Sequence, residues 1–177
     1  TAANTYADGT TIGGGTLLLS GSGTLGDITA DLTVNTGGTL DLGGTSQTVN
    51  IFSGSGGSVT NSSSTAARLT INGAGTFAGT IVNGTGSVAL TLNGSGTDAL
   101  TSSATGSNTY SGGTQLNAGT LLGTDTTVYT GTGPTTNKLF GTGIIAMADG
   151  TTLQVRVDGD GTTGAQTLSY GNTVTLS

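Results

Sequence analysis

The chain of 177 residues has no cysteine, histidine, tryptophan or glutamate, and it has a single proline. Without cysteine, disulfide bonds cannot stabilise the fold, so hydrogen-bonded ladders and packing must do so. The lack of histidine and cysteine also excludes Ser-His-Asp and Cys-His catalytic groups and histidine-based zinc sites. Glycine, threonine, serine and asparagine dominate instead, and these residues are weak helix formers. The composition therefore argues against a helical fold.

Charge is also scarce, at 7% of the residues. Three Lys and Arg residues stand against nine Asp residues, so the net charge is −6 and no basic patch is available for nucleic acid. No run of 18 apolar residues is present, which excludes a membrane-spanning helix. The chain begins with Thr1 and shows no signal peptide, so we expect residues 1–177 to be a single segment of a longer protein.

Aliphatic residues alternate with polar ones in short runs that end at glycine or asparagine. Alternation over four to six residues with turn-forming boundaries is typical of half-buried β-strands. The residues predicted to point inward are Leu32 and Val34, Leu40 and Leu42, Val49 and Ile51, Leu69 and Ile71, Val88, Leu90 and Leu92, Leu153, Val155 and Val157, and Val174 and Leu176. The sequence therefore predicts an all-β protein.

Five of these or similar runs end in an aliphatic residue, an asparagine and, within two positions, a glycine. The asparagines are Asn35, Asn72, Asn83, Asn93 and Asn117. Asparagine and glycine both tolerate the left-handed backbone conformation that bends a strand sharply. In a coiled architecture such asparagines can stack at one corner and bond to one another along the axis.

Two topologies fit short strands at this spacing. One is an antiparallel β-sandwich, and the other is a parallel β-solenoid with turns of 20–25 residues, which would give roughly eight turns. A sandwich needs bulky residues to fill a gap of about 10 Å between its sheets. Since aromatic residues make up only 4% of the chain, the narrow aliphatic core of a solenoid is the favoured interpretation.

The chain also repeats itself. Residues 4–18 (NTYADGTTIGGGTLL) and 108–122 (NTYSGGTQLNAGTLL) share nine of fifteen positions. Internal repetition is a mark of stacked architectures. Both copies resemble the autotransporter-associated β-strand repeat, whose pattern runs NTYSGGT, a short strand and AGTL. The resemblance extends through residues 23–44 and 90–105, so it covers most of the chain up to about residue 125.

This resemblance implies a right-handed parallel β-helix from an exported bacterial surface protein, such as an autotransporter passenger. The expected function is that of a non-catalytic structural or adhesive rod, secreted or on the cell surface, whose partner is a cell-surface or matrix ligand. The alternative is a module that associates with copies of itself to form filaments or biofilm contacts. A third hypothesis is a carbohydrate-active β-helix enzyme.

Few residues could support chemistry or metal binding. Glycoside hydrolysis needs two carboxyl groups beside one bond, and Asp27, Asp31 and Asp41 are the candidates, although a solvent-exposed polar face explains them better. Asp158 and Asp160, in the run VDGDGTTG, are a candidate calcium site, although a plain polar turn is the preferred interpretation. No other cofactor is expected. Tyr6 and Tyr110 occupy equivalent positions of the two copies, where we expect them to pack at a corner.

Overall fold

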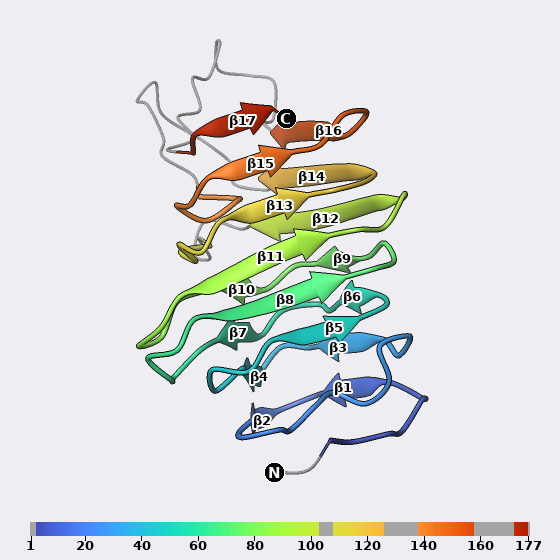
Figure 1. Cartoon of the computed structure of the whole chain (residues 1–177), viewed down its shortest axis with the longest axis vertical. Helices are drawn as coiled ribbons and strands as arrows, with labels where there is room; N and C mark the ends of the chain where they lie inside the picture. Colours follow the sequence, from blue (N-terminus) through green and yellow to red (C-terminus); the bar gives the residue numbers. More distant parts are fainter. Residues whose placement is uncertain (1–2, 103–107, 126–137, 158–171, 177) are drawn as a thin grey trace.

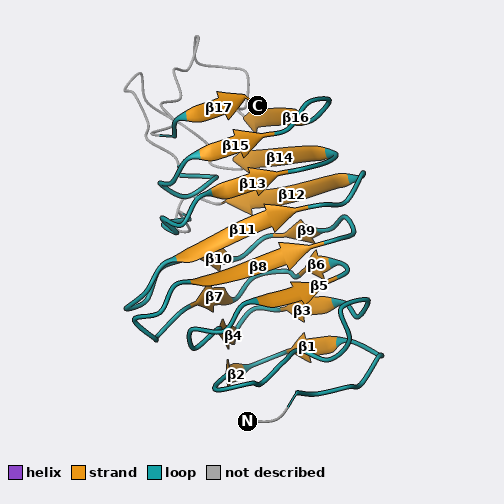
Figure 2. Ribbon diagram, in the orientation of Figure 1, coloured by secondary structure: helices purple, strands orange, loops and turns teal. Residues whose placement is uncertain are grey.

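A computed structural model describes residues 3–102, 108–125, 138–157 and 172–176 of the chain. These residues form seventeen strands and no helix, arranged in a coil with three faces (Figures 1 and 2). The first face consists of β1 (Thr10–Ile12), β3 (Leu32–Val34), β6 (Phe52–Ser53), β9 (Thr76–Phe77), β12 (Thr97–Ser102), β14 (Thr120–Asp125) and β16 (Thr152–Val157). The second face consists of β2 (Gly15–Leu18), β4 (Gly38–Asp41), β7 (Ser58–Thr60) and β10 (Thr80–Ile81). The third face consists of β5 (Gln47–Val49), β8 (Ala67–Ile71), β11 (Val88–Leu92), β13 (Thr114–Leu116), β15 (Ile145–Met147) and β17 (Val174–Leu176).

Pairing between neighbouring strands is parallel throughout the described residues. Each face is a ladder in which a strand pairs with the strand one turn earlier and one turn later, as in the order β17-β15-β13-β11-β8-β5. On the first face, a parallel bridge between Gly54 and Phe77 joins the lower sheet to the upper one. The fold is therefore a parallel β-solenoid, and the antiparallel sandwich is wrong for this part of the chain.

The predicted count of eight turns is also wrong, because the turns do not have a constant length. The described residues form about five turns, from β3 to β15, with further described strands below and above them. In the lower turns Leu32 pairs with Phe52, 20 residues later, and Leu90 pairs with Thr114, 24 residues later. Higher up, Thr114 pairs with Ile145, 31 residues later. The longer upper turns use residues that a constant period would have assigned to additional coils.

The core is a narrow column of aliphatic side chains inside the coil. On the third face, one residue from each of five successive strands is stacked in register and at most 8% exposed: Val49, Ile71, Leu92, Leu116 and Met147. The predicted inward direction of Val49, Ile71 and Leu92 is therefore confirmed. The prediction fails at Ile51, which is only half-buried because the chain bends after β5 and buries Phe52 instead. It also fails at Val155, Val174 and Leu176, which are 40%, 47% and 77% exposed on β16 and β17, the last described strands of their sheets.

Phe52 packs against Phe77 of the next turn, with ring centroids 4.4 Å apart. Two residues later, Gly54 adopts a φ of 152°, and a Cβ atom there would overlap the carbonyl oxygen of Val34 in the turn below. A side chain at this position would therefore push two coils apart.

Asparagines form a ladder along one corner, as predicted, but only some of them take part. Asn93 donates to Asn72 at 3.0 Å and accepts a hydrogen bond from Asn117 at 2.9 Å, and all three are exposed where third-face strands end. Asn83 lies at a different corner, where its side chain bonds to Ser111 at 2.7 Å. Asn35 bonds to the neighbouring coil at a further corner. The ladder therefore joins asparagines one full turn apart rather than successive ones along the chain.

Candidate functional site

The candidate calcium ligands Asp158 and Asp160 lie outside the described residues, so this site stays a prediction. Within the described residues, no group of three or more aspartates is placed to hold a metal ion.

Each of the three candidate carboxylates accepts hydrogen bonds that stabilise a different bend of the backbone. Asp27 accepts hydrogen bonds from the backbone N–H and the hydroxyl of Thr29 at 2.8 and 2.7 Å, and these bonds lower its pKa. Asp31 accepts from the side-chain amide of Asn50 at 2.9 Å. Asp41 ends β4, where it accepts backbone N–H groups from its own turn and from the next. The three aspartates therefore stabilise the backbone locally, and no two of them lie on either side of a cavity.

The two repeat copies build the same local corner in different surroundings. The hydroxyl of Tyr6 bonds to Thr10 at 2.6 Å, and that of Tyr110 bonds to Thr114 at 2.8 Å. Tyr110 is fully buried, which confirms the expected packing role, whereas Tyr6 is 42% exposed. The two repeat copies also lie on different faces of the solenoid. The strand after Tyr6 is β1 on the first face, and the strand after Tyr110 is β13 on the third.

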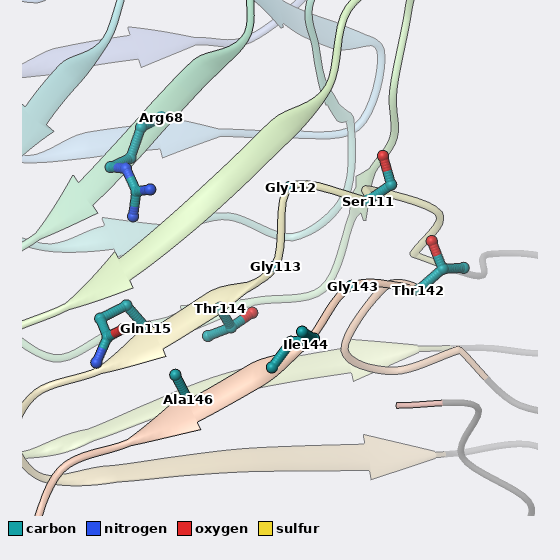
Figure 3. A pocket seen from close by; sticks show the side chains of 10 residues that line it. All are labelled: Arg68, Ser111, Gly112, Gly113, Thr114, Gln115, Thr142, Gly143, Ile144 and Ala146. Atoms are coloured by element: carbon teal, nitrogen blue, oxygen red, sulfur yellow. The ribbon is translucent and has the colours of Figure 1, made fainter. Parts of the chain in front are cut away.

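The described surface carries a trough of about 400 Å³ on the outer side of the third face. It lies over β13 and β15 and extends to Arg68 on β8, and Figure 3 shows the side chains that surround it. The residues that line it are Arg68, Ser111, Gly112, Gly113, Thr114, Gln115, Thr142, Gly143, Ile144 and Ala146. We call this feature the Arg68 trough.

The Arg68 trough exists because the corner between the second and third faces becomes shorter in the upper turns. In the lower turns six residues, 61–66 and then 82–87, connect a second-face strand to the next third-face strand. In the next turn Tyr110 bonds to Ile81 of the second face, and only residues 111–113 separate it from β13. Gly113 makes this tight corner with a φ of 82°, and a Cβ atom there would lie 2.8 Å from the carbonyl oxygen of Ile144.

The polar groups of the Arg68 trough stand at its two ends. The guanidinium of Arg68 and the carboxamide of Gln115 lie toward one end, and the hydroxyls of Ser111 and Thr142 lie toward the other (Figure 3). Arg68 is exposed and donates to the hydroxyl of Thr91, one turn above it, at 2.6 Å. No carboxylate among the described residues forms an ion pair with Arg68. The trough thus presents a positive group on a chain whose net charge is −6.

Sequence reasoning missed this site. Arg68 is one of only three cationic residues, and it stands inside a strand that is otherwise neutral, which is the signal that could have drawn attention to it. The other walls come from residues more than 40 positions later, and nothing in the sequence indicates that they meet Arg68.

No helix long and apolar enough to cross a membrane occurs among the described residues. The resemblance of the two copies to the autotransporter-associated repeat remains a prediction, because no protein-family model matches the chain and no curated protein or solved structure is significantly similar to it.

Proposed function

We propose that this chain is a non-catalytic structural and adhesive rod of an exported bacterial surface protein, secreted or held at the cell surface. The solenoid is then the right-handed β-helix of a passenger-type protein, as the two NTY copies suggest. Its partner is a ligand on another cell or in the surrounding matrix.

The observation that carries this proposal is the parallel ladders that join successive coils, the longest of which runs through all six described strands of the third face. Since each coil hydrogen-bonds to the coils beside it, order extends along the axis without disulfide bonds or a large core. The faces also carry rows of hydroxyl groups in register, such as Thr16, Thr39, Ser58 and Thr80 on the second face. A stiff body with regular polar faces suits a role in contact rather than in catalysis.

An adhesion assay tests the proposal. Beads coated with the purified chain should bind bacterial cells, host cells or matrix proteins more than beads coated with a non-adhesive protein of similar charge. Heat-unfolded chain on the same beads should lose this binding, because the faces exist only in the coil. Equal retention by coated and control beads on every surface would reject the adhesive role.

Self-association is the second candidate, and exposed apolar residues at the lower end favour it. Leu18 of β2 is 56% exposed, and among the described strands β2 pairs only with β4. An apolar edge with free backbone groups can pair with another chain. Sedimentation velocity over a range of concentrations should then show assembly that Leu18→Lys suppresses, whereas a monomer at every concentration would reject this candidate.

A further inference from the structure

The Arg68 trough has the chemistry of a site for an acidic sugar. We propose that it binds a glycan through a sugar residue that carries a carboxylate, with Arg68 pairing the carboxylate. Gln115, Ser111 and Thr142 then hydrogen-bond to the sugar hydroxyls. This inference rests on the proposed adhesive function and names the class of ligand.

The charged end is suited to a carboxylate. A guanidinium has five N–H donors in a planar fork that fits the two oxygens of a carboxylate. In Arg68 the Nη1 atom contacts the hydroxyl of Thr91, which holds the side chain against the face and leaves further donors available. Since no described carboxylate neutralises Arg68, an incoming anion would meet an unpaired charge.

The rest of the trough is suited to a sugar ring. Its floor is formed by small residues, among them Gly112, Gly113 and Ala146, so a ring can approach the backbone closely. Ile144 is 56% exposed beside this floor and offers an apolar contact to the C–H groups of a sugar. The volume of about 400 Å³ lies within the range of small-molecule sites.

The opposite end favours a sugar over an acidic peptide. The hydroxyl of Ser111 accepts a hydrogen bond from Asn83 at 2.7 Å and keeps its own proton to donate. The hydroxyl of Thr142 donates to the carbonyl of Tyr110 at 3.5 Å and keeps lone pairs to accept, so this end offers one donor and one acceptor to the hydroxyl groups of a saccharide. An aspartate or glutamate side chain would engage Arg68 but would make no contact with Ser111 and Thr142 at this end. A single contact of this kind is weak, and repeated sugar residues on a long glycan would add avidity on a surface that displays many rods.

Calorimetric titration with an oligosaccharide of glucuronic acid tests the proposal directly. The unmodified chain should bind it, and a counterpart whose carboxylates have been reduced to hydroxymethyl groups should bind at least about tenfold more weakly, because the charge-assisted bonds are lost. Arg68→Ala should cause a similar loss for the acidic oligosaccharide. Arg156→Ala is the matched control, since Arg156 is exposed on β16 of the first face and its removal should leave the affinity unchanged.

Several outcomes would overturn the proposal. Equal affinity for the acidic and the reduced oligosaccharide would show that the carboxylate plays no role in binding. Equal losses of affinity in Arg68→Ala and Arg156→Ala would mean that only the net charge of the chain matters. Tighter binding of an oligo-aspartate peptide would assign the trough to a peptide instead. Circular dichroism of both variants should match the unmodified chain. If beads coated with the Arg68→Ala variant still adhere to cells, the proposal for the Arg68 trough fails while the proposal of an adhesive rod stands. The adhesion assay therefore distinguishes the failure of one proposal from the failure of the other.

Discussion

Replacing Asp98 by asparagine should remove a pH dependence that this carboxyl gives to the stability of the fold. Asp98 lies on the inner side of β12, where it is 5% exposed and stacks in register with Leu121 of β14. Burial raises its pKa to about 6, against a smaller opposite effect of the hydrogen bond that it accepts from the backbone N–H of Gly75 at 3.2 Å. A carboxyl with a raised pKa destabilises the folded chain whenever it is ionised.

The sign and size of the effect follow from linkage. Between the ordinary pKa of 3.8 and about 6, the folded state holds the proton of Asp98 more tightly than the unfolded state does. The contribution of Asp98 is therefore most favourable below pH 4, is lost as the pH rises to about 6, and is constant above that. The loss is about 3 kcal/mol from the shift alone and about 2 kcal/mol once partial screening by solvent is included.

Urea denaturation measured at several pH values between 4 and 7 would detect this loss. Between pH 4 and 7 the unfolding free energy of Asp98→Asn should fall by about 2 kcal/mol less than that of the unmodified chain. The cost of placing an amide in the core does not depend on pH, so it does not affect this difference. Asp41→Asn is the control. Burial opposes ionisation of Asp41, but hydrogen bonds from Ser62 and Gly43 outweigh burial and lower its pKa. This variant should therefore lose stability at neutral pH. Identical pH profiles for the unmodified chain and Asp98→Asn would refute the argument.

Three further substitutions test individual contacts by their effect on the free energy of unfolding. Tyr110→Phe removes a buried hydrogen bond and should cost about 1–2 kcal/mol, whereas Tyr6→Phe, which removes the equivalent exposed bond, should cost about 0.5 kcal/mol or less; equal costs would contradict the difference in burial. Gly54→Ala should cost about 2–4 kcal/mol through overlap with the neighbouring coil, while Gly13→Ala, with open space around it, should be nearly neutral. Asn93→Ala breaks two bonds of the asparagine ladder and should cost about 1 kcal/mol in thermal or urea unfolding; no change would mean that the ladder adds no stability.

The strand pattern of this protein could be predicted because the alternation of side chains is local. Pairs such as Leu69 and Ile71 lie two positions apart on one strand, so their common direction needs no knowledge of the neighbouring coils. The pattern failed where the chain turns, as at Ile51, because the position of a bend depends on the coil beneath it. It also failed at Val174 and Leu176, because alternation does not show that β17 pairs with a described strand on one side only. Asp98 is a further exception, since a strand with a buried carboxyl does not follow the alternation of apolar and polar residues.

The number of turns and the candidate site could not be predicted, because both depend on the number of residues that connect one strand to the next. The identical spacing of NTY and GT in the two copies gave no sign that one strand would follow on the first face and the other on the third. The Arg68 trough likewise arises from a difference in corner length between successive turns. Short and long corners have similar Gly, Ser and Thr compositions, so the sequence does not distinguish them.

The central claim is that the strands of the third face stack in parallel, one coil upon another. Pulsed electron paramagnetic resonance on doubly spin-labelled chains tests it most directly. Labels at Thr48 paired in turn with Gln115, Ala146 and Thr175 span three, four and five coils of one row. The mean separation should rise by about 4.8 Å for each added coil, which is the spacing of neighbouring strands. Separations that do not rise in this order, or that alternate as in an antiparallel sheet, would contradict the account.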